Sequence, residues 1–192
     1  MKTKPFSNFE LTEKLLAIGS STEKRTKLVN LFLTKPAYLP MLLELCFSGK
    51  PKISAKACRL LEFVCNIDLS IILPYSKEFF SKIGLLEKDA EIRPAGKICE
   101  LLMIAHYVKK DAATQLHILK PQREKIIETC FHWMLSDQKV AAQAHAMTCL
   151  QLLGTEFSWI HPELKIILDR NYASKSAGYQ ARARMVLKKM KP

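Results

Sequence analysis

Apolar positions recur every three or four residues through most of the chain, and this period is typical of helices with one buried face. The segment "SSTEKRTKLVNLFLTK" opens with capping-type hydroxyl residues, and "PQREKIIETCFHWML" opens with a proline suited to a first helical turn. Gly49, Gly84 and Gly154 follow other apolar segments and are typical helix ends. No segment favours a strand, so the pattern predicts an all-α chain of about ten helices with short connections. The least regular stretch, "KKDAATQLHILKP", is predicted to be a short helix or a loop.

The segment "KVAAQAHAMTCL" places small residues at alternate positions, namely Ala142, Ala144 and Ala146. Strict alternation usually indicates a half-buried strand, but Ala, Gln and Met are helix formers. On a helix, at about 100° per residue, positions two apart lie on widely separated faces. Small residues on two opposed faces let neighbouring backbones approach from both sides. This pattern therefore indicates a helix stacked between two others.

Four segments of this kind align without gaps, starting at Ile53, Ile92, Val140 and Tyr179. The starts 53, 92, 140 and 179 are 39, 48 and 39 residues apart, which is the range of two-helix repeats. Position +2 from each start holds Ala55, Pro94, Ala142 and Ala181. Position +4 holds Ala57, Gly96, Ala144 and Ala183. We therefore expect a leucine at position 144 to disturb the packing between neighbouring helices.

Two of these helices, "DAEIRPAGKICELL" and "DQKVAAQAHAMTCL", resemble the second helix of HEAT repeats, in which an acid precedes Val or Ile and a small residue follows. The resemblance covers roughly residues 36–192 and implies a right-handed α-α superhelix, that is, an ARM- or HEAT-like solenoid. It predicts a single domain, 1–192. Residues 1–35 would form an N-terminal capping helix pair, and 36–192 about four helix-pair repeats.

The C-terminal segments "SWIHPELKIIL" and "YQARARMV" are also similar to those of small bacterial all-α proteins, some of which are labelled adenylosuccinate lyase. Lyases of that superfamily are much longer and carry a Met-Pro-x-Lys-x-Asn signature loop, which is absent from this sequence. Lyase activity is therefore the last of three functional hypotheses.

The charge of the chain is strongly positive, because 30 basic and 18 acidic side chains give a formal net charge of +12. The excess is spread along the chain, and seven basic residues but no acid follow Asp169. This balance favours an anionic partner, either an acidic protein surface or nucleic acid, although lysine-rich faces also keep helical proteins soluble. We expect the polar positions beside the small residues to form the binding surface: Lys56, Arg93, Lys97, Gln143, His145, Arg182 and Arg184.

The cellular location follows from what the sequence lacks. No apolar run approaches the roughly 20 residues of a membrane span, and the N-terminus has no signal-peptide core. We therefore expect a cytoplasmic protein with no membrane contact. The six cysteines lie in apolar segments without a C-x-x-C pair, and we expect them to be reduced core thiols.

Motifs of catalysis are also absent, since the sequence has no G-x-S-x-G elbow and no glycine-rich phosphate loop. Cys130, His132, His145 and Cys149 have zinc-ligand chemistry, but the first two point about 200° apart on a helix. We therefore expect no catalytic residue, no metal and no cofactor.

The leading hypothesis is a non-enzymatic scaffold with a basic concave surface. The alternative, implied by the likeness to HEAT-type proteins, is a DNA glycosylase acting on alkylated bases. In that case Trp133 and Asp137 would recognise the base, whereas in a scaffold Trp133 and Trp159 are expected to be core anchors.

Overall fold

The fold is known from a computed structural model, which describes residues 7–19, 21–136 and 138–190. These residues contain helices and no strand, so the predicted all-α class is confirmed. The stretch expected to be either a short helix or a loop contains the short helix α7. In chain order, the α-helices of the described residues are α1 (Asn8–Ala17), α2 (Thr22–Thr34), α3 (Leu39–Cys46), α4 (Pro51–Ile67), α5 (Ser76–Lys82), α6 (Asp89–Met103), α7 (Ala112–His117), α8 (Lys120–Leu135), α9 (Val140–Leu153), α10 (Ile160–Tyr172) and α11 (Ala177–Lys189). Shorter helical turns are η1 (Pro36–Tyr38), η2 (Leu69–Tyr75), η3 (Ile83–Leu85) and the π-helical η4 (Ile104–Val108).

Local signals set many of the helix ends. The Ser7 hydroxyl accepts a hydrogen bond from the Glu10 backbone N–H at 3.2 Å, and the Glu10 carboxylate accepts one from the Ser7 N–H at 2.9 Å. This capping box satisfies two backbone donors at the start of α1. Of the hydroxyl residues expected to cap α2, Ser20 lies outside the described residues and Ser21 is the N-cap. Gly49 follows α3 with a φ of 68°, a conformation that favours glycine.

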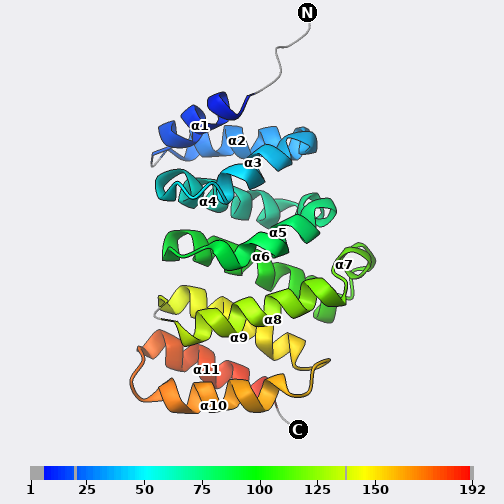
Figure 1. The fold of residues 1–192 in the computed structure, drawn as a ribbon, viewed down its shortest axis with the longest axis vertical. Coiled ribbons are helices and arrows are strands. Elements are labelled where there is room, and N and C mark those ends of the chain that lie inside the picture. Colours follow the sequence, from blue (N-terminus) through cyan, green and yellow to red (C-terminus); the bar gives the residue numbers. More distant parts are fainter. Residues whose placement is uncertain (1–6, 20, 137, 191–192) are drawn as a thin grey trace, which may run out of the picture.

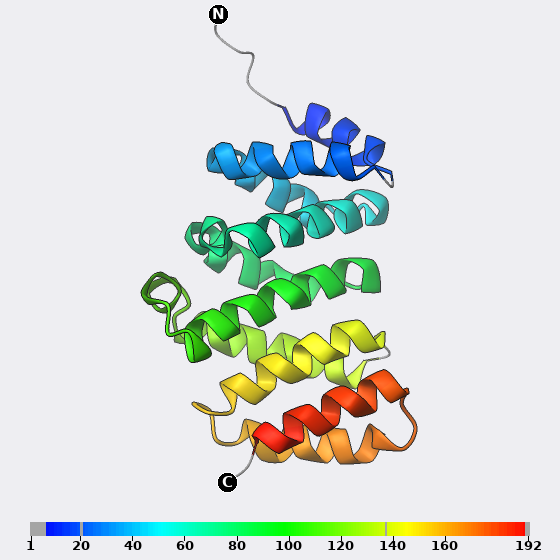
Figure 2. The same cartoon turned by 180° about the vertical axis from the view of Figure 1, so that it is seen from behind.

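The helices are stacked along one axis in two layers (Figures 1 and 2). We call α2, α4, α6, α9 and α11 the inner layer; they follow one another in Figure 2, and each packs against the next. The outer layer, nearest the viewer in Figure 1, contains α3, α5, α8 and α10. Because the chain alternates between layers, an inner helix can touch outer partners as well as its inner neighbours, as α9 touches α6, α8, α10 and α11.

The spacing of the inner helices differs from the spacing expected from the sequence. Helices α4, α6, α9 and α11 begin at residues 51, 89, 140 and 177, which are 38, 51 and 37 residues apart. The same spacing relates four buried alanines, each at most 1% exposed: Ala57, Ala95, Ala146 and Ala183. The gap-free alignment had instead matched Ala57 and Ala183 with Gly96 and Ala144, and Ala144 is only partly buried. The alignment was therefore one residue out of register in α6 and two in α9.

Close approach of neighbouring backbones is clearest at Gly96 on α6. A Cβ atom added there would lie 3.3 Å from the Cβ of His145 on α9 and 3.5 Å from the Trp133 ring on α8. On α9, both Ala142 and Ala146 are fully buried. Small residues thus occupy the places where an inner helix meets its neighbours, as the sequence pattern indicated.

The core runs continuously through the stack and includes all six cysteines. Each cysteine is buried and none forms a disulfide, which confirms the prediction of core thiols. Burial raises the pKa of the Cys46, Cys99 and Cys149 thiols well above the usual value, so these side chains are neutral and unreactive. No helix within the described residues is both long and apolar enough to cross a membrane.

Candidate anion-binding site

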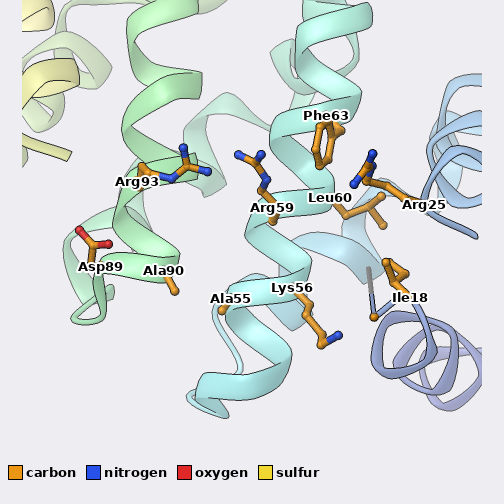
Figure 3. A pocket seen from close by; sticks show the side chains of 11 residues that line it. Ile18, Arg25, Ala55, Lys56, Arg59, Leu60, Phe63, Asp89, Ala90 and Arg93 are labelled. Carbon is orange, nitrogen blue, oxygen red and sulfur yellow. The ribbon is translucent and has the colours of Figure 1, made fainter. Parts of the chain in front are cut away.

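A pocket of about 520 Å³ opens on the inner layer between α2, α4 and α6. Its charged lining residues come from all three helices and comprise four cations and one carboxylate: Arg25, Lys56, Arg59, Asp89 and Arg93. We call this site the arginine pocket. Two of the predicted binding residues, Lys56 and Arg93, therefore meet in it. In Figure 3 the side chains of Arg59 and Arg93 point toward each other across the gap between α4 and α6.

Phe63 on α4 positions two of these arginines. Its ring lies between them in Figure 3, with the guanidinium carbons of Arg25 and Arg59 at 4.6 and 4.5 Å from the ring centroid. Each such cation–π contact contributes about 0.5–1 kcal/mol at an exposed site. Arg59 also donates a hydrogen bond to Glu62 at 2.6 Å. Both guanidinium groups are therefore held in place without a ligand, whereas Arg93 has no hydrogen-bond or ion-pair partner among the described residues.

Three other predicted residues, Lys97, His145 and Arg182, converge on the carboxylate of Glu100. Lys97 and His145 each donate to Glu100 Oε2 at 2.9 Å, and Arg182 Nη1 lies 3.6 Å from Glu100 Oε1. Arg182 also donates to the hydroxyl of Thr148 at 3.1 Å. Because the Glu100 side chain is only 6% exposed, this cluster links α6, α9 and α11 through a buried carboxylate. These three predicted binding residues are thus already engaged by a carboxylate within the fold.

The pKa of Glu100 reflects this environment. Burial alone would raise it, but the hydrogen bonds and positive charges of His145 and Lys97 outweigh burial and lower the pKa to about 2. The unfolded chain therefore binds the Glu100 proton more tightly than the folded chain. Stability from the ionised carboxylate is complete above the usual glutamate pKa of about 4.3 and is lost as the pH falls toward 2.

We accordingly expect Glu100→Gln to be less stable than the wild type at neutral pH and to show a smaller loss of stability upon acidification. Urea unfolding at a series of pH values between neutrality and about 3 measures both effects. If the two proteins lose stability in parallel across that range, the low pKa assigned to Glu100 is wrong.

Gln143 and Arg184 lie elsewhere. Gln143 is fully buried, and its amide nitrogen donates to backbone oxygens at the end of α8, the shortest bond being 3.2 Å to Ser136. It therefore satisfies carbonyl groups that the last helical turn leaves free. Arg184 donates to the hydroxyl of Tyr172 on α10 at 2.6 Å, so it joins α11 to the outer layer. The structure does not bring either residue to the arginine pocket or to Glu100.

The residues considered for metal binding do not form one site. Cys130 and Cys149 are neighbours in the core, but His132 is exposed and His145 is bound to Glu100. Within the described residues, no group of three or more His, Cys, Asp or Glu side chains could hold a metal ion. Trp133, named for base recognition, is fully buried, and its proposed companion Asp137 lies outside the described residues.

Sequence reasoning missed Arg25, Arg59 and Phe63. A signal for Arg59 was present, because the observed spacing of 38 residues between α4 and α6 aligns "ACRLLE" (57–62) with "AGKICE" (95–100). This alignment makes Arg59 equivalent to Lys97 and Glu62 equivalent to Glu100. Arg59 forms an ion pair with Glu62 at 2.6 Å, and Lys97 forms one with Glu100 at 2.9 Å. The same spacing of a cation and a carboxylate therefore recurs on α4 and α6.

Comparisons with known proteins found no relative of this chain. The chain gave no match to a protein-family model and no significant match to a curated protein or a solved structure. The resemblances to HEAT repeats and to the small bacterial proteins therefore stay predictions.

Proposed function

We propose that the chain is a HEAT-like α-solenoid, a right-handed superhelix of helix pairs, that serves as a non-enzymatic binding scaffold. Two observations support the repeat architecture. Helices alternate between an inner and an outer layer along one axis, and equivalent inner positions hold the four buried alanines Ala57, Ala95, Ala146 and Ala183. Stacked repeats of this kind present an extended surface, which suits recognition of a macromolecule.

The arginine pocket is the single observation that carries the binding proposal. Four cations and one carboxylate line an open pocket, and Arg93 has no partner within the described part of the chain. Like charges a few ångström apart repel by about 1 kcal/mol in water and by more near a protein surface. An anion in the pocket would relieve this repulsion. The partner we propose is accordingly a nucleic-acid backbone or an acidic protein surface.

Binding at two salt concentrations tests this proposal. We expect the wild type to bind labelled duplex DNA or polyglutamate at about 50 mM salt. If four phosphates of a duplex are contacted, the affinity should fall roughly 100-fold when the salt is raised to about 200 mM. Fluorescence anisotropy measures both values. Failure to bind either polyanion at the lower salt concentration would contradict the proposed function.

Two activity assays, on duplex DNA that carries alkylated bases and on adenylosuccinate, test the enzymatic alternatives. Release of alkylated bases from the duplex would favour the glycosylase hypothesis over the scaffold hypothesis. Cleavage of adenylosuccinate would favour the lyase hypothesis. The full burial of Trp133 leaves no aromatic face at that residue for a base, which is why we propose binding alone.

A further inference from the structure

Arginine is concentrated in the arginine pocket. The chain contains 7 arginines and 23 lysines, yet the pocket is lined by three arginines, Arg25, Arg59 and Arg93, and by one lysine, Lys56. A guanidinium group is planar, donates two parallel hydrogen bonds to oxygen pairs and stacks on aromatic rings, whereas an ammonium group acts as a point charge. This bias indicates recognition of a defined oxyanion rather than diffuse attraction.

The positions of the cations suit neighbouring anions along a strand better than a single anion. Arg59 and Arg93 point toward each other on one side of Phe63, while Arg25 lies on its other side (Figure 3). Each of the two charged oxygens of a phosphate in a nucleic-acid strand has lone pairs for more than one donor, so Arg59 and Arg93 can share one phosphate. Cations on two sides of one ring also fit two neighbouring phosphates better than a single anion.

We propose that the arginine pocket binds two neighbouring phosphates of a nucleic-acid strand, with Arg59 and Arg93 sharing one phosphate and Arg25 holding the next. This inference deepens the proposed function and rests on it, since it names the partner of the same surface. A nucleoside monophosphate has related phosphate chemistry but offers a single phosphate group. Asp89 on α6 is the one carboxylate in the pocket lining, and its charge opposes the ligand.

The main test compares two arginine variants. The probe is a labelled oligothymidine of roughly 15 nucleotides, and its affinity is measured by anisotropy at several salt concentrations from about 50 mM upward. We expect Arg93→Ala to bind about tenfold more weakly, with a salt slope smaller by about 0.7. Arg170→Ala removes the same charge from an exposed position on α10, and its affinity should change less than about twofold. Because the Arg93 side chain has no hydrogen-bond or ion-pair partner within the described residues, its variant should melt like the wild type.

Two further variants distinguish binding in the arginine pocket from general attraction between the basic protein and an anion. Phe63→Leu keeps every charge but removes the ring that positions Arg25 and Arg59, so binding should weaken about threefold to fivefold with an unchanged salt slope. Asp89→Asn removes the opposing charge, so binding should strengthen about threefold. Damage to the fold could not produce that gain.

The outcomes are distinguishable from failure of the proposed function. Equal affinity of Arg93→Ala and Arg170→Ala for oligothymidine would overturn the pocket assignment and leave the scaffold standing. Binding of polyglutamate, but not oligothymidine, through Arg93 would overturn the preference for phosphate. Adenosine monophosphate is added as a competitor at the same concentration of phosphate groups as the oligonucleotide. If it displaces the oligonucleotide, the ligand is a free nucleotide and the assignment of a nucleic-acid strand is overturned. Binding of no polyanion would overturn both proposals.

Discussion

Replacing Trp133 with alanine is expected to lower the free energy of unfolding by about 3–5 kcal/mol. Trp133 on α8 is fully buried, and its ring fills the space beside Gly96 on α6, at the junction of the outer layer with two inner helices. Truncation would remove the largest fully buried side chain and leave a cavity that packed helices cannot readily close. Chemical denaturation monitored by circular dichroism measures the loss.

The chain provides a matched control in Trp159→Ala. Sequence reasoning treated both tryptophans as core anchors, but Trp159 is 53% exposed and stacks on Phe131 with a centroid distance of 5.6 Å. Removing this ring should lower the free energy of unfolding by about 1 kcal/mol or less, because the ring buries little apolar area and only one aromatic pair is lost. If Trp159→Ala loses more unfolding free energy than Trp133→Ala, the assignment of Trp133 to the core and of Trp159 to the surface is wrong.

The second large effect is expected for Ala146→Leu. Ala146 is fully buried on α9 and equivalent to Ala57 and Ala95 in the preceding inner helices. Three added carbon atoms have no free space between close-packed helices, so we expect a loss of about 1–3 kcal/mol or more. Thermal melts with far-ultraviolet circular dichroism measure the change.

Ala144→Leu is the control, because it places the same side chain two residues earlier on the same helix. Ala144 is partly exposed, so its replacement should change the stability by about 0.5 kcal/mol or less. This reverses the expectation from the gap-free alignment, which placed the sensitive position at Ala144. If Ala144→Leu melts lower than Ala146→Leu, the sequence-based register is right and the observed register is wrong.

Much of the fold could be predicted from the sequence because helix periodicity and small residues are local signals. Alternating alanines around Ala144 indicated two-sided packing, and Ala142 and Ala146 show it. The register could not be predicted by the alignment, because small residues stand at several nearby positions of one helix, as Ala142, Ala144 and Ala146 do on α9. Several registers therefore place a small residue at the aligned position, and only the tertiary contacts show which of them is buried.

The candidate site was only partly predictable, for a different reason. Helical position identified Lys56, Arg93 and Lys97 as polar residues of inner helices, but the neutralisation of Lys97 by Glu100 depends on tertiary contacts. Arg25 joins the pocket from α2, which lies outside the aligned repeats. The contribution of Phe63 depends on two guanidinium groups meeting at one ring, and a sequence does not show such convergence.

The central claim is that anions bind to the inner layer at the arginine pocket. Amide chemical-shift mapping tests it most directly, by titrating the isotope-labelled 21.9 kDa chain with oligothymidine. We predict that the largest shifts cluster on α2, α4 and α6 around Arg25, Arg59 and Arg93, with small shifts on α8 and α10. Saturable shifts confined to the outer layer, with the residues of the arginine pocket unchanged, would contradict the account.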